Sequence, residues 1–272
     1  MRTIVQLSDL HFGRIDEALI GPLTDQVRNF HPDLVVVSGD LTQRARTREF
    51  KQARQFLDTL PTPQIVVPGN HDVPLHNLFS RFVTPLAKYQ RYITDDLEPV
   101  YVDDEIAVLG INTARSLTIK DGRISDRQIQ HAKTLLCSTR DDVVKIIVTH
   151  HPFDLPSHYD ERDLVGRAPL AMEMFAACRA DLLLAGHMHA SHAGDSAARY
   201  KIGEYSAIVV QAGTATSTRG RGEANSFNLI RAERAQITIE RFSWNTERVL
   251  FELSSTEIFK RVAKDWRRVA AP

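Results

Sequence analysis

Five times along the chain, a short apolar run rich in β-branched residues ends at side chains of the types that bind metals. The runs have the composition of buried strands and occupy residues 3–7, 34–37, 65–67, 143–149 and 182–185. The segments that follow them are Ser8-Asp9-Leu10-His11, Ser38-Gly39-Asp40, Gly69-Asn70-His71-Asp72, His150-His151-Pro152 and Gly186-His187-Met188-His189. Because ligands of α/β sheets bind at the carboxyl ends of strands, we expect these five loops to meet at one place.

The remaining patterns predict an α/β fold in a single domain that spans residues 1–272. Strands are also expected at 106–111, 207–211, 226–230 and 236–241. Two helices have clear start signals, since Thr47 can cap one and Ser125 with Gln128 forms a capping box before the other. Strands first alternate with helices and later follow one another, so we expect mixed sheets with helices outside.

The strand-end residues make a coherent set of metal ligands. Too many for one tetrahedral site, they suit two adjacent cations, with Asp40 as the bridge because a carboxylate has two oxygens. Asp9 and His11 alternate, as do His187 and His189, so each pair can face one side of an extended segment. Two cations close together can activate water and clamp the oxygens of a phosphoryl group. The candidate ligands are Asp9, His11, Asp40, Asn70, His150, His187 and His189.

Taken singly, each motif has an ordinary structural explanation. Gly39-Asp40 can cap a helix, and Asn70 with its neighbours can form a turn. His187 and His189 can belong to a half-exposed strand. Coincidence at five strand ends is a far weaker explanation than one shared site.

Taken in order, the five segments resemble the five signatures of the calcineurin-like metallophosphoesterases. Ser8-Asp9-Leu10-His11-Phe12 and Gly39-Asp40-Leu41-Thr42 are most similar to bacterial class III cyclic-nucleotide phosphodiesterases and to glycerophosphodiesterases. The resemblance implies a four-layer αββα sandwich with two divalent metal ions at one edge. Mn or Fe is favoured, and Zn is possible because the set holds nitrogen and oxygen without thiolate.

The resemblance also implies individual roles. One metal would take Asp9, His11, Asp40 and His189, and the other Asp40, Asn70, His150 and His187. His71 would be the catalytic residue that protonates the leaving oxygen or stabilises its charge, and Asp72 would hold the His71 ring. His151 would point away from the metals. Asn70 and Asn112 are candidates for substrate binding, and a plain turn role for Asn112 is equally open.

The implied activity is hydrolysis of small phosphodiesters by metal-activated hydroxide, with 3',5'-cyclic nucleotides ahead of glycerophosphodiesters. The alternatives are a pyrophosphatase or phosphomonoesterase acting on a nucleotide-sugar or lipid-linked substrate, and a non-enzymatic scaffold. The scaffold is disfavoured because all seven ligands and His71 are present. Lys+Arg and Asp+Glu both number 34, which argues against a nucleic-acid partner held by bulk charge.

Some residues near the motifs allow two readings. A helix that packs Phe79, Phe82 and Leu86 into the core is expected after the Asn70 loop. The alternative is a wall of the substrate pocket that is lined by His76, Phe79, Arg81, Phe82 and Tyr89. Arg44 is expected in a solvated helix start, and Arg219 and Arg221 in an exposed Gly-rich loop without a substrate role.

The C-terminal segment predicts a basic amphipathic helix over about 255–269, with an apolar stripe that includes Ile258, Val262 and Trp266. Such a helix could contact an anionic membrane, its own domain or a partner subunit, and the oligomeric state stays open. Cys137 and Cys178 are too few for a disulfide framework, and polar Ser8 comes too early for a signal peptide. We therefore expect a cytoplasmic protein.

Overall fold

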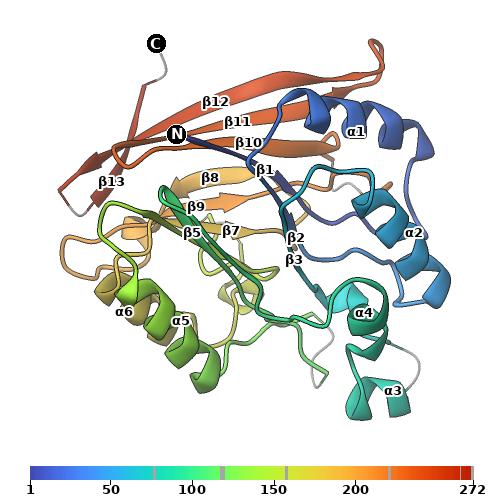
Figure 1. The fold of residues 1–272 in the computed structure, drawn as a ribbon, viewed down its shortest axis with the longest axis horizontal. Helices are drawn as coiled ribbons and strands as arrows, with labels where there is room; N and C mark the ends of the chain where they lie inside the picture. The colour runs from blue at the N-terminus through green and yellow to red at the C-terminus, as the bar shows by residue number, and fades with distance from the viewer. Residues whose placement is uncertain (76–77, 117–119, 157–158, 220–221, 264, 271–272) are drawn as a thin grey trace.

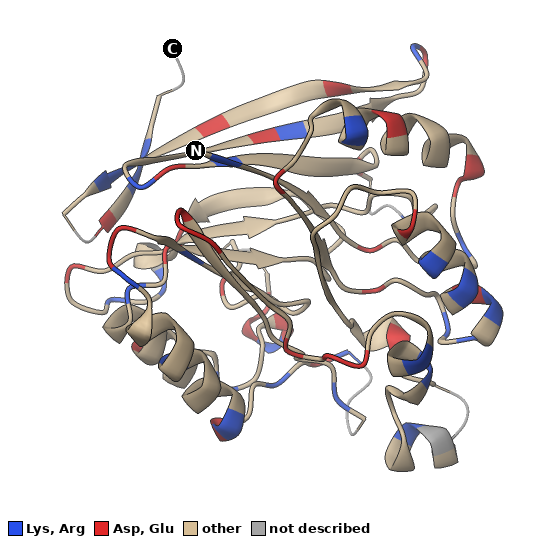
Figure 2. Ribbon diagram, viewed as in Figure 1, with Lys and Arg blue, Asp and Glu red and all other residues tan. Residues whose placement is uncertain are grey.

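The computed structural model describes residues 1–272 except 76–77, 117–119, 157–158, 220–221, 264 and 271–272. Two β-sheets pack face to face, and helices cover their outer faces (Figure 1). The Lys, Arg, Asp and Glu residues lie mostly on the helices, the loops and the strands nearest the C-terminus, whereas the central strands hold few of them (Figure 2).

The first sheet combines a parallel and an antiparallel half. Its β1, β2 and β3 run parallel, and β10 joins β1 antiparallel. The antiparallel meander continues outward from β10 to β13. In spatial order the strands are β13 (Asp265–Val269), β12 (Leu250–Val262), β11 (Gln236–Asn245), β10 (Ser226–Ala232), β1 (Arg2–Leu7), β2 (Leu34–Ser38) and β3 (Gln64–Val67).

The second sheet has four parallel strands, β5, β6, β7 and β9, with an antiparallel strand at each edge. In spatial order its strands are β4 (Val100–Val102), β5 (Ile106–Gly110), β6 (Val144–Val148), β7 (Leu182–Ala185), β9 (Ile208–Gln211) and β8 (His192–Asp195). Every strand that the sequence predicts is found, and β4, β8, β12 and β13 are additional.

Alternation along the strands creates separate apolar layers. In β1, Ile4 lies in the core between the sheets, while Val5 and Leu7 lie in the core beneath the helices. The predicted αββα sandwich is thereby confirmed. Its α-helices are α1 (Ile20–Asn29), α2 (Thr47–Leu57), α3 (Leu78–Val83), α4 (Ala87–Tyr92), α5 (Asp126–Ser138) and α6 (Ala168–Ala177).

The local helix signals are largely confirmed. Ser125 caps α5, with its hydroxyl accepting from the Gln128 amide. Thr47 is the first residue of α2, not its cap. The packing predicted for Phe79 and Phe82 is wrong: their side chains are 74% and 55% exposed, because the six-residue helix α3 turns its apolar side outward, and only Leu86 is buried.

The predicted C-terminal helix is wrong, because residues 250–262 and 265–269 form the strands β12 and β13. Side chains four residues apart share a face in a strand as well as in a helix, so the apolar spacing was ambiguous. Residues 250–260 form a strand because they pair with β11. In this arrangement Phe259 and Trp266 are buried between the sheets, and Val262 is exposed. The membrane contact, which was one of three alternatives for that helix, loses its basis. No helix in the described part of the chain has the length and apolar character to cross a bilayer.

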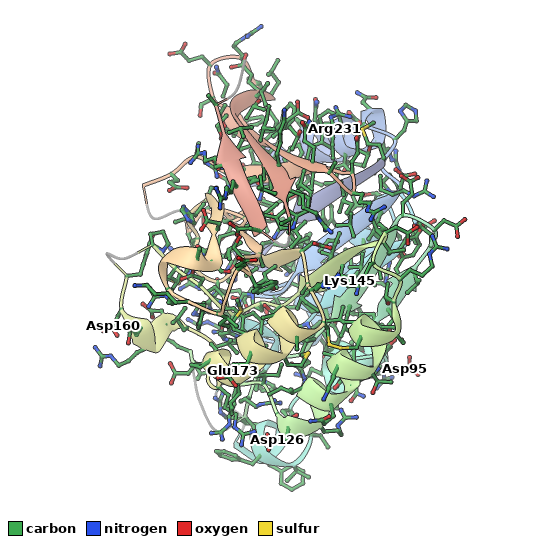
Figure 3. The ribbon with its side chains drawn as sticks, turned by 90° about the vertical axis from the view of Figure 1, so that its left-hand side faces the viewer. Asp95, Asp126, Lys145, Asp160, Glu173 and Arg231 are labelled. Atoms are coloured by element: carbon green, nitrogen blue, oxygen red, sulfur yellow. A yellow bond between two sulfur atoms is a disulfide. The ribbon has the colours of Figure 1, made fainter. Side chains whose placement is uncertain are left out.

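Cys137 near the end of α5 and Cys178 just after α6 form a disulfide, which the cysteine count did not predict. These two helices lie on the face that Figure 3 turns toward the viewer, where Asp126 and Glu173 are labelled on them. Disulfides persist mainly in oxidising compartments, so the pair weighs against the expected cytoplasmic location, which stays a prediction.

Removing this disulfide should lower stability. It closes a loop with a sequence separation of 41 residues, for which chain entropy predicts a loss of about 4 kcal/mol at most. The comparison is urea unfolding of the wild-type chain and the double variant Cys137→Ser, Cys178→Ser without reductant. Adding reductant should bring the wild-type midpoint to that of the variant. Equal midpoints in both conditions would contradict the prediction.

Candidate metal centre

The predicted ligand loops lie side by side because backbone hydrogen bonds join them. The amide of Asp9 donates to the carbonyl of Gly39 at 3.1 Å, and that of His11 to the carbonyl of Asp40 at 2.9 Å. The Gly69 loop, which follows β3 of the same sheet, packs against Asp40: a Cβ on Gly69 would lie 2.1 Å from Asp40 Oδ1. The Gly186 loop, which follows β7 of the other sheet, packs against Ser8: a Cβ on Gly186 would lie 1.8 Å from Ser8 Oγ. Such contacts leave no room for a side chain, so both positions require glycine.

The ligand residues themselves have unusual backbone conformations. The φ angles of Asp9, His11, Asp40, His187 and His189 are all positive, between 51° and 73°. The prediction that each pair alternates along an extended segment is therefore wrong. Left-handed turns after β1, β2 and β7 aim the side chains instead. Non-glycine residues avoid this region, and its repeated use here is typical of a functional site.

One cluster consists of Asp9, His11, Asp40 and His189, all buried. His11 Nε2 lies 3.1 Å from His189 Nε2 and 3.6 Å from Asp9 Oδ1. His189 Nε2 lies 3.3 Å from Asp9 Oδ1, and His11 Nε2 lies 3.7 Å from Asp40 Oδ2. Asp9 Oδ1 is buried without a hydrogen-bond partner. A buried carboxylate oxygen that faces two imidazole nitrogens and has no hydrogen-bond partner is expected where a cation binds.

The second cluster consists of Asp40, Asn70, His150 and His187. Asn70 Oδ1 lies 3.1 Å from both His150 Nε2 and His187 Nδ1, and these two nitrogens are 3.3 Å apart. Asp40 Oδ1 lies 3.4 Å from His150 Nε2. Asp40 therefore presents Oδ2 to the first cluster and Oδ1 to the second.

The spacing of these atoms fits cation binding. Metal bonds of about 2.0 to 2.2 Å to nitrogen and oxygen place neighbouring ligand atoms roughly 3 to 3.6 Å apart. The separations in the two clusters are 3.1 to 3.6 Å and agree with that range. The distance of 3.7 Å from His11 Nε2 to Asp40 Oδ2 lies just above it. The residues could hold two divalent cations with Asp40 between them.

Hydrogen bonds behind the clusters hold the ligand atoms in position. The Ser8 hydroxyl and the His187 amide donate to Asp9 Oδ2 at 2.7 and 3.0 Å, which leaves Oδ1 toward the cluster. His150 Nδ1 lies 2.9 Å from the Ser38 carbonyl, so this nitrogen carries the proton of the neutral ring, and Nε2 is the nitrogen that could bind a cation once it is deprotonated. Such contacts to the second atom of a ligand group set its orientation.

The electrostatics follow from crowding buried acids and imidazoles together. Burial would raise the pKa of Asp40, but His150 and His71 hold it well below its ordinary value. Burial lowers the pKa of His150, but the Asp40 and Asp9 carboxylates outweigh it and raise the pKa to about 9. For His187, burial and the neighbouring His150 lower the pKa to about 3. The clusters therefore favour ionised carboxylates, which attract cations.

His151 lies beside the second cluster but does not join it. Its Nδ1 lies 2.8 Å from Thr113 Oγ1, and its Nε2 lies 2.8 Å from the Lys120 carbonyl. Its ring does not point away as predicted, because one ring nitrogen lies within 4.8 Å of ligand nitrogens of His150 and His187. Both ring nitrogens already have partners in the protein, so we do not count His151 among the ligands.

His71 stands at the edge of the first cluster, with its ring 4.8 Å from that of His11. Its Nδ1 lies 2.8 Å from the Gln43 carbonyl, and Arg219 Nη1 lies 3.0 Å from its Nε2. A neutral ring with its proton on Nδ1 satisfies both contacts. The atom that can exchange a proton with a substrate is therefore Nε2, which faces Arg219.

The contact predicted between Asp72 and the His71 ring is wrong. Asp72 accepts hydrogen bonds from the amides of Leu41, Thr42 and Gly69 at 3.2, 2.9 and 2.9 Å. Through these hydrogen bonds, Asp72 connects the Asp40 loop with the Asn70 loop. The chain turns into a 3-10 helix at Asn70–Asp72, and this turn points His71 and Asp72 in different directions. Burial and the nearby Asp40 raise the pKa of Asp72 to about 6.

Asn112 serves a turn rather than the site. It is buried, and its Oδ1 accepts from the Ala114 amide at 2.9 Å. Among the described residues that line the cavity beside His71, Asn112 does not occur. The structure thus favours the turn reading, and a substrate contact for Asn112 has no geometric support.

A cavity of about 360 Å³ opens beside His71. Its walls include several residues to which the sequence assigned no role, among them Gln43, Lys120 and Arg219. These residues follow different strands, and no spacing in the sequence links them. The described lining residues are Gln43, Arg44, Asn70, His71, Val73, Leu75, Arg81, Lys120 and Arg219.

Comparison with known proteins yields one family and related phosphodiesterases. The sequence model of a family described as calcineurin-like phosphoesterase matches residues 2–191. The chain is 26% identical over 172 residues to the glycerophosphodiester phosphodiesterase GpdQ of Enterobacter lignolyticus, which covers 56% of this chain and 58% of that protein. It is 24% identical over 199 residues to a "Probable cyclic nucleotide phosphodiesterase" of Synechococcus sp., covering 69% and 73%. The first alignment spans less than two thirds of the GpdQ relative.

Among solved structures, the chain is similar to the purple acid phosphatase PPD1 from yellow lupin (Lupinus luteus). The TM-score is 0.73 at 10% sequence identity, and the match covers 97% of this chain and 54% of that one. At this identity the likeness concerns the fold, and it agrees with the arrangement of two sheets and outer helices.

Proposed function

The chain belongs to the calcineurin-like phosphoesterase family, and we therefore propose that it is a dinuclear-metal phosphodiesterase acting on small phosphodiesters. The observation that carries the proposal is the pair of clusters that share Asp40, with one carboxylate oxygen in each. The names of the GpdQ and cyclic-nucleotide relatives support a diester substrate. We include 3',5'-cyclic nucleotides in the proposed class.

The two clusters divide the ligands. Asp9, His11, Asp40 and His189 would hold one cation, and Asp40, Asn70, His150 and His187 the other. When bound, a pair of divalent cations supplies Lewis acidity toward phosphoryl oxygens and lowers the pKa of water. The nitrogen and oxygen donors suit Mn or Fe, and Zn is compatible.

His71 and Arg219 act on the substrate side of this centre. To protonate a leaving oxygen, His71 needs a proton on Nε2 in addition to the one on Nδ1, and Nε2 now meets Arg219 Nη1. A bound phosphate would attract the guanidinium, which has several donors, and so free Nε2 for the leaving group. We assign His71 to the leaving oxygen and Arg219 to the phosphate.

Metal content and a substrate panel test the proposal. The chain loaded with Mn²⁺ should contain two metal ions and should hydrolyse diesters with the highest kcat/KM. The panel contains 3',5'-cyclic AMP, a glycerophosphodiester, a nucleotide-sugar pyrophosphate and 4-nitrophenyl phosphate. A single bound metal, or a preference for the monoester or the pyrophosphate, would contradict the proposal.

A further inference from the structure

The cavity beside His71 is strongly cationic. Arg44, Arg81, Lys120 and Arg219 reach its wall from separate parts of the fold, and no described lining residue carries a carboxyl group. Arg44 follows β2, Arg81 belongs to α3, and Arg219 follows β9. Clefts lined by one sign of charge attract ions of the opposite sign, so four cations around about 360 Å³ of space favour the binding of an anion there.

The protein itself does not supply that anion for three of the four. Arg44 and Lys120 are exposed side chains, and in the described part of the chain neither forms an ion pair with a carboxylate. Lys120 also lines a neighbouring cavity whose wall holds carboxylates, but none of the described ones lies within ion-pair distance of its ammonium group. The side chain of Arg219 contacts the His71 ring. Arginines elsewhere do find carboxylates, as Arg199 does with Asp154 at 2.6 Å. The positive charge of the cavity is therefore directed at something outside the chain.

The scissile phosphate alone does not account for this charge. The proposed metal centre sets two divalent cations against the carboxylates of Asp9 and Asp40, so it is positive before substrate binds. A phosphodiester carries one negative charge, which the metal centre already balances. Arg219, beside His71, can assist the same phosphate, but Arg44 and Lys120 then remain without a partner.

We propose that the natural substrate carries a second anionic group, a phosphate or a carboxylate, which Arg44 and Lys120 bind while the diester lies at the metal centre. This inference rests on the proposed function and narrows its substrate class. A simple cyclic mononucleotide or glycerol diester has one negative charge, so it would leave the outer cations unused. A guanidinium and an ammonium together suit a phosphate or a carboxylate.

A pair of synthetic esters that differ only in the second anion tests the inference. One is 4-nitrophenyl ethyl phosphate, and the other is 4-nitrophenyl 2-phosphonoethyl phosphate, whose phosphonate cannot be hydrolysed. With the full chain loaded with Mn²⁺, the phosphonate ester should have a kcat/KM at least about 10-fold higher, mainly through KM, because contacts to charged groups are strong. Raising the salt concentration should reduce this preference.

Substitutions of Arg44 and Lys120 test whether these two side chains cause the preference for the phosphonate ester. Arg44→Met and Lys120→Met should each reduce the ratio of the two kcat/KM values, and the double variant should bring it close to one. Arg48→Met is the matched control, since Arg48 is exposed on α2 and does not line the cavity. That variant should keep the wild-type ratio.

The outcomes separate the two proposals. Turnover of both esters with a ratio near one would overturn the second-anion inference and leave the proposed function standing. A preference that survives in the double variant would overturn it as well. Absence of turnover with two metals bound would contradict the proposed function, and calorimetric binding of the two esters would then decide, because equal affinities also overturn the inference.

Discussion

Asp40→Ala is expected to empty both cation sites and to lower kcat/KM at least about 10³-fold, the loss of several kcal/mol of charge stabilisation. The reason is that this one carboxylate faces both clusters, with Oδ2 3.7 Å from His11 Nε2 and Oδ1 3.4 Å from His150 Nε2. No other ligand residue of the two clusters has this position. Loss of Asp40 therefore removes a donor from each site at once.

The measurement is metal per chain by mass spectrometry after dialysis, together with kcat/KM on a diester. Asp58→Ala is the control, because Asp58 is an exposed aspartate after α2 that pairs with Arg54 on the surface. It should retain two metals and full activity. Circular dichroism shows whether the variants are folded. Asp40→Ala with one tightly bound metal and substantial activity would remove the bridging assignment.

His71→Ala is expected to keep both metals and to lose about 10²- to 10⁴-fold in rate on alkyl diesters, the usual worth of a general acid. Its Nε2 faces the cavity, while its Nδ1 is held by the Gln43 carbonyl at 2.8 Å. A good leaving group needs no proton, so the loss should shrink for 4-nitrophenyl diesters. The logarithm of the rate constant, plotted against the pKa of the leaving group, should therefore have a steeper slope for the variant.

His31→Ala serves as the matched control, because His31 is exposed at the loop after α1 and its ring lies 2.9 Å from the Asn29 carbonyl. It should behave as the wild type on both kinds of ester. The same rate loss for His71→Ala on alkyl and 4-nitrophenyl esters would exclude proton donation and leave charge stabilisation as its role. Loss of metal from His71→Ala would show that it supports the ligand loops instead.

Much of the site could be predicted because its signals are local. Each of the five segments combines an apolar run with ligand-type residues directly after it, and the parallel pairing of β1 with β2 and of β6 with β7 brings the segments together. The glycines at 69 and 186 belong to the local motifs, but the reason for them is tertiary, because Asp40 and Ser8 from other loops leave no room for a Cβ. The identity of the seven candidate ligands needed no tertiary information beyond strand-end convergence.

Predictions failed where distant packing decides between equal local options. Ile258 and Val262 are spaced for a helix or a strand, and the partner strand β11 selects the strand. Asp72 follows His71 directly, yet the turn at Asn70–Asp72 sends its carboxylate to the Thr42 amide instead of the ring. Neither choice is encoded within a few residues, because both depend on groups contributed by other elements.

By itself, the sequence determined which residues can bind cations, where the strands end and hence that a pair of cations could be held between two sheets. Tertiary structure alone decided that Asp40 offers one oxygen to each cluster and that Arg44, Lys120 and Arg219 line one cavity. The physical reason is the distance along the sequence over which each feature is determined. Strand and ligand patterns repeat over a few residues, whereas the meeting of side chains from separate loops depends on how whole sheets and helices pack.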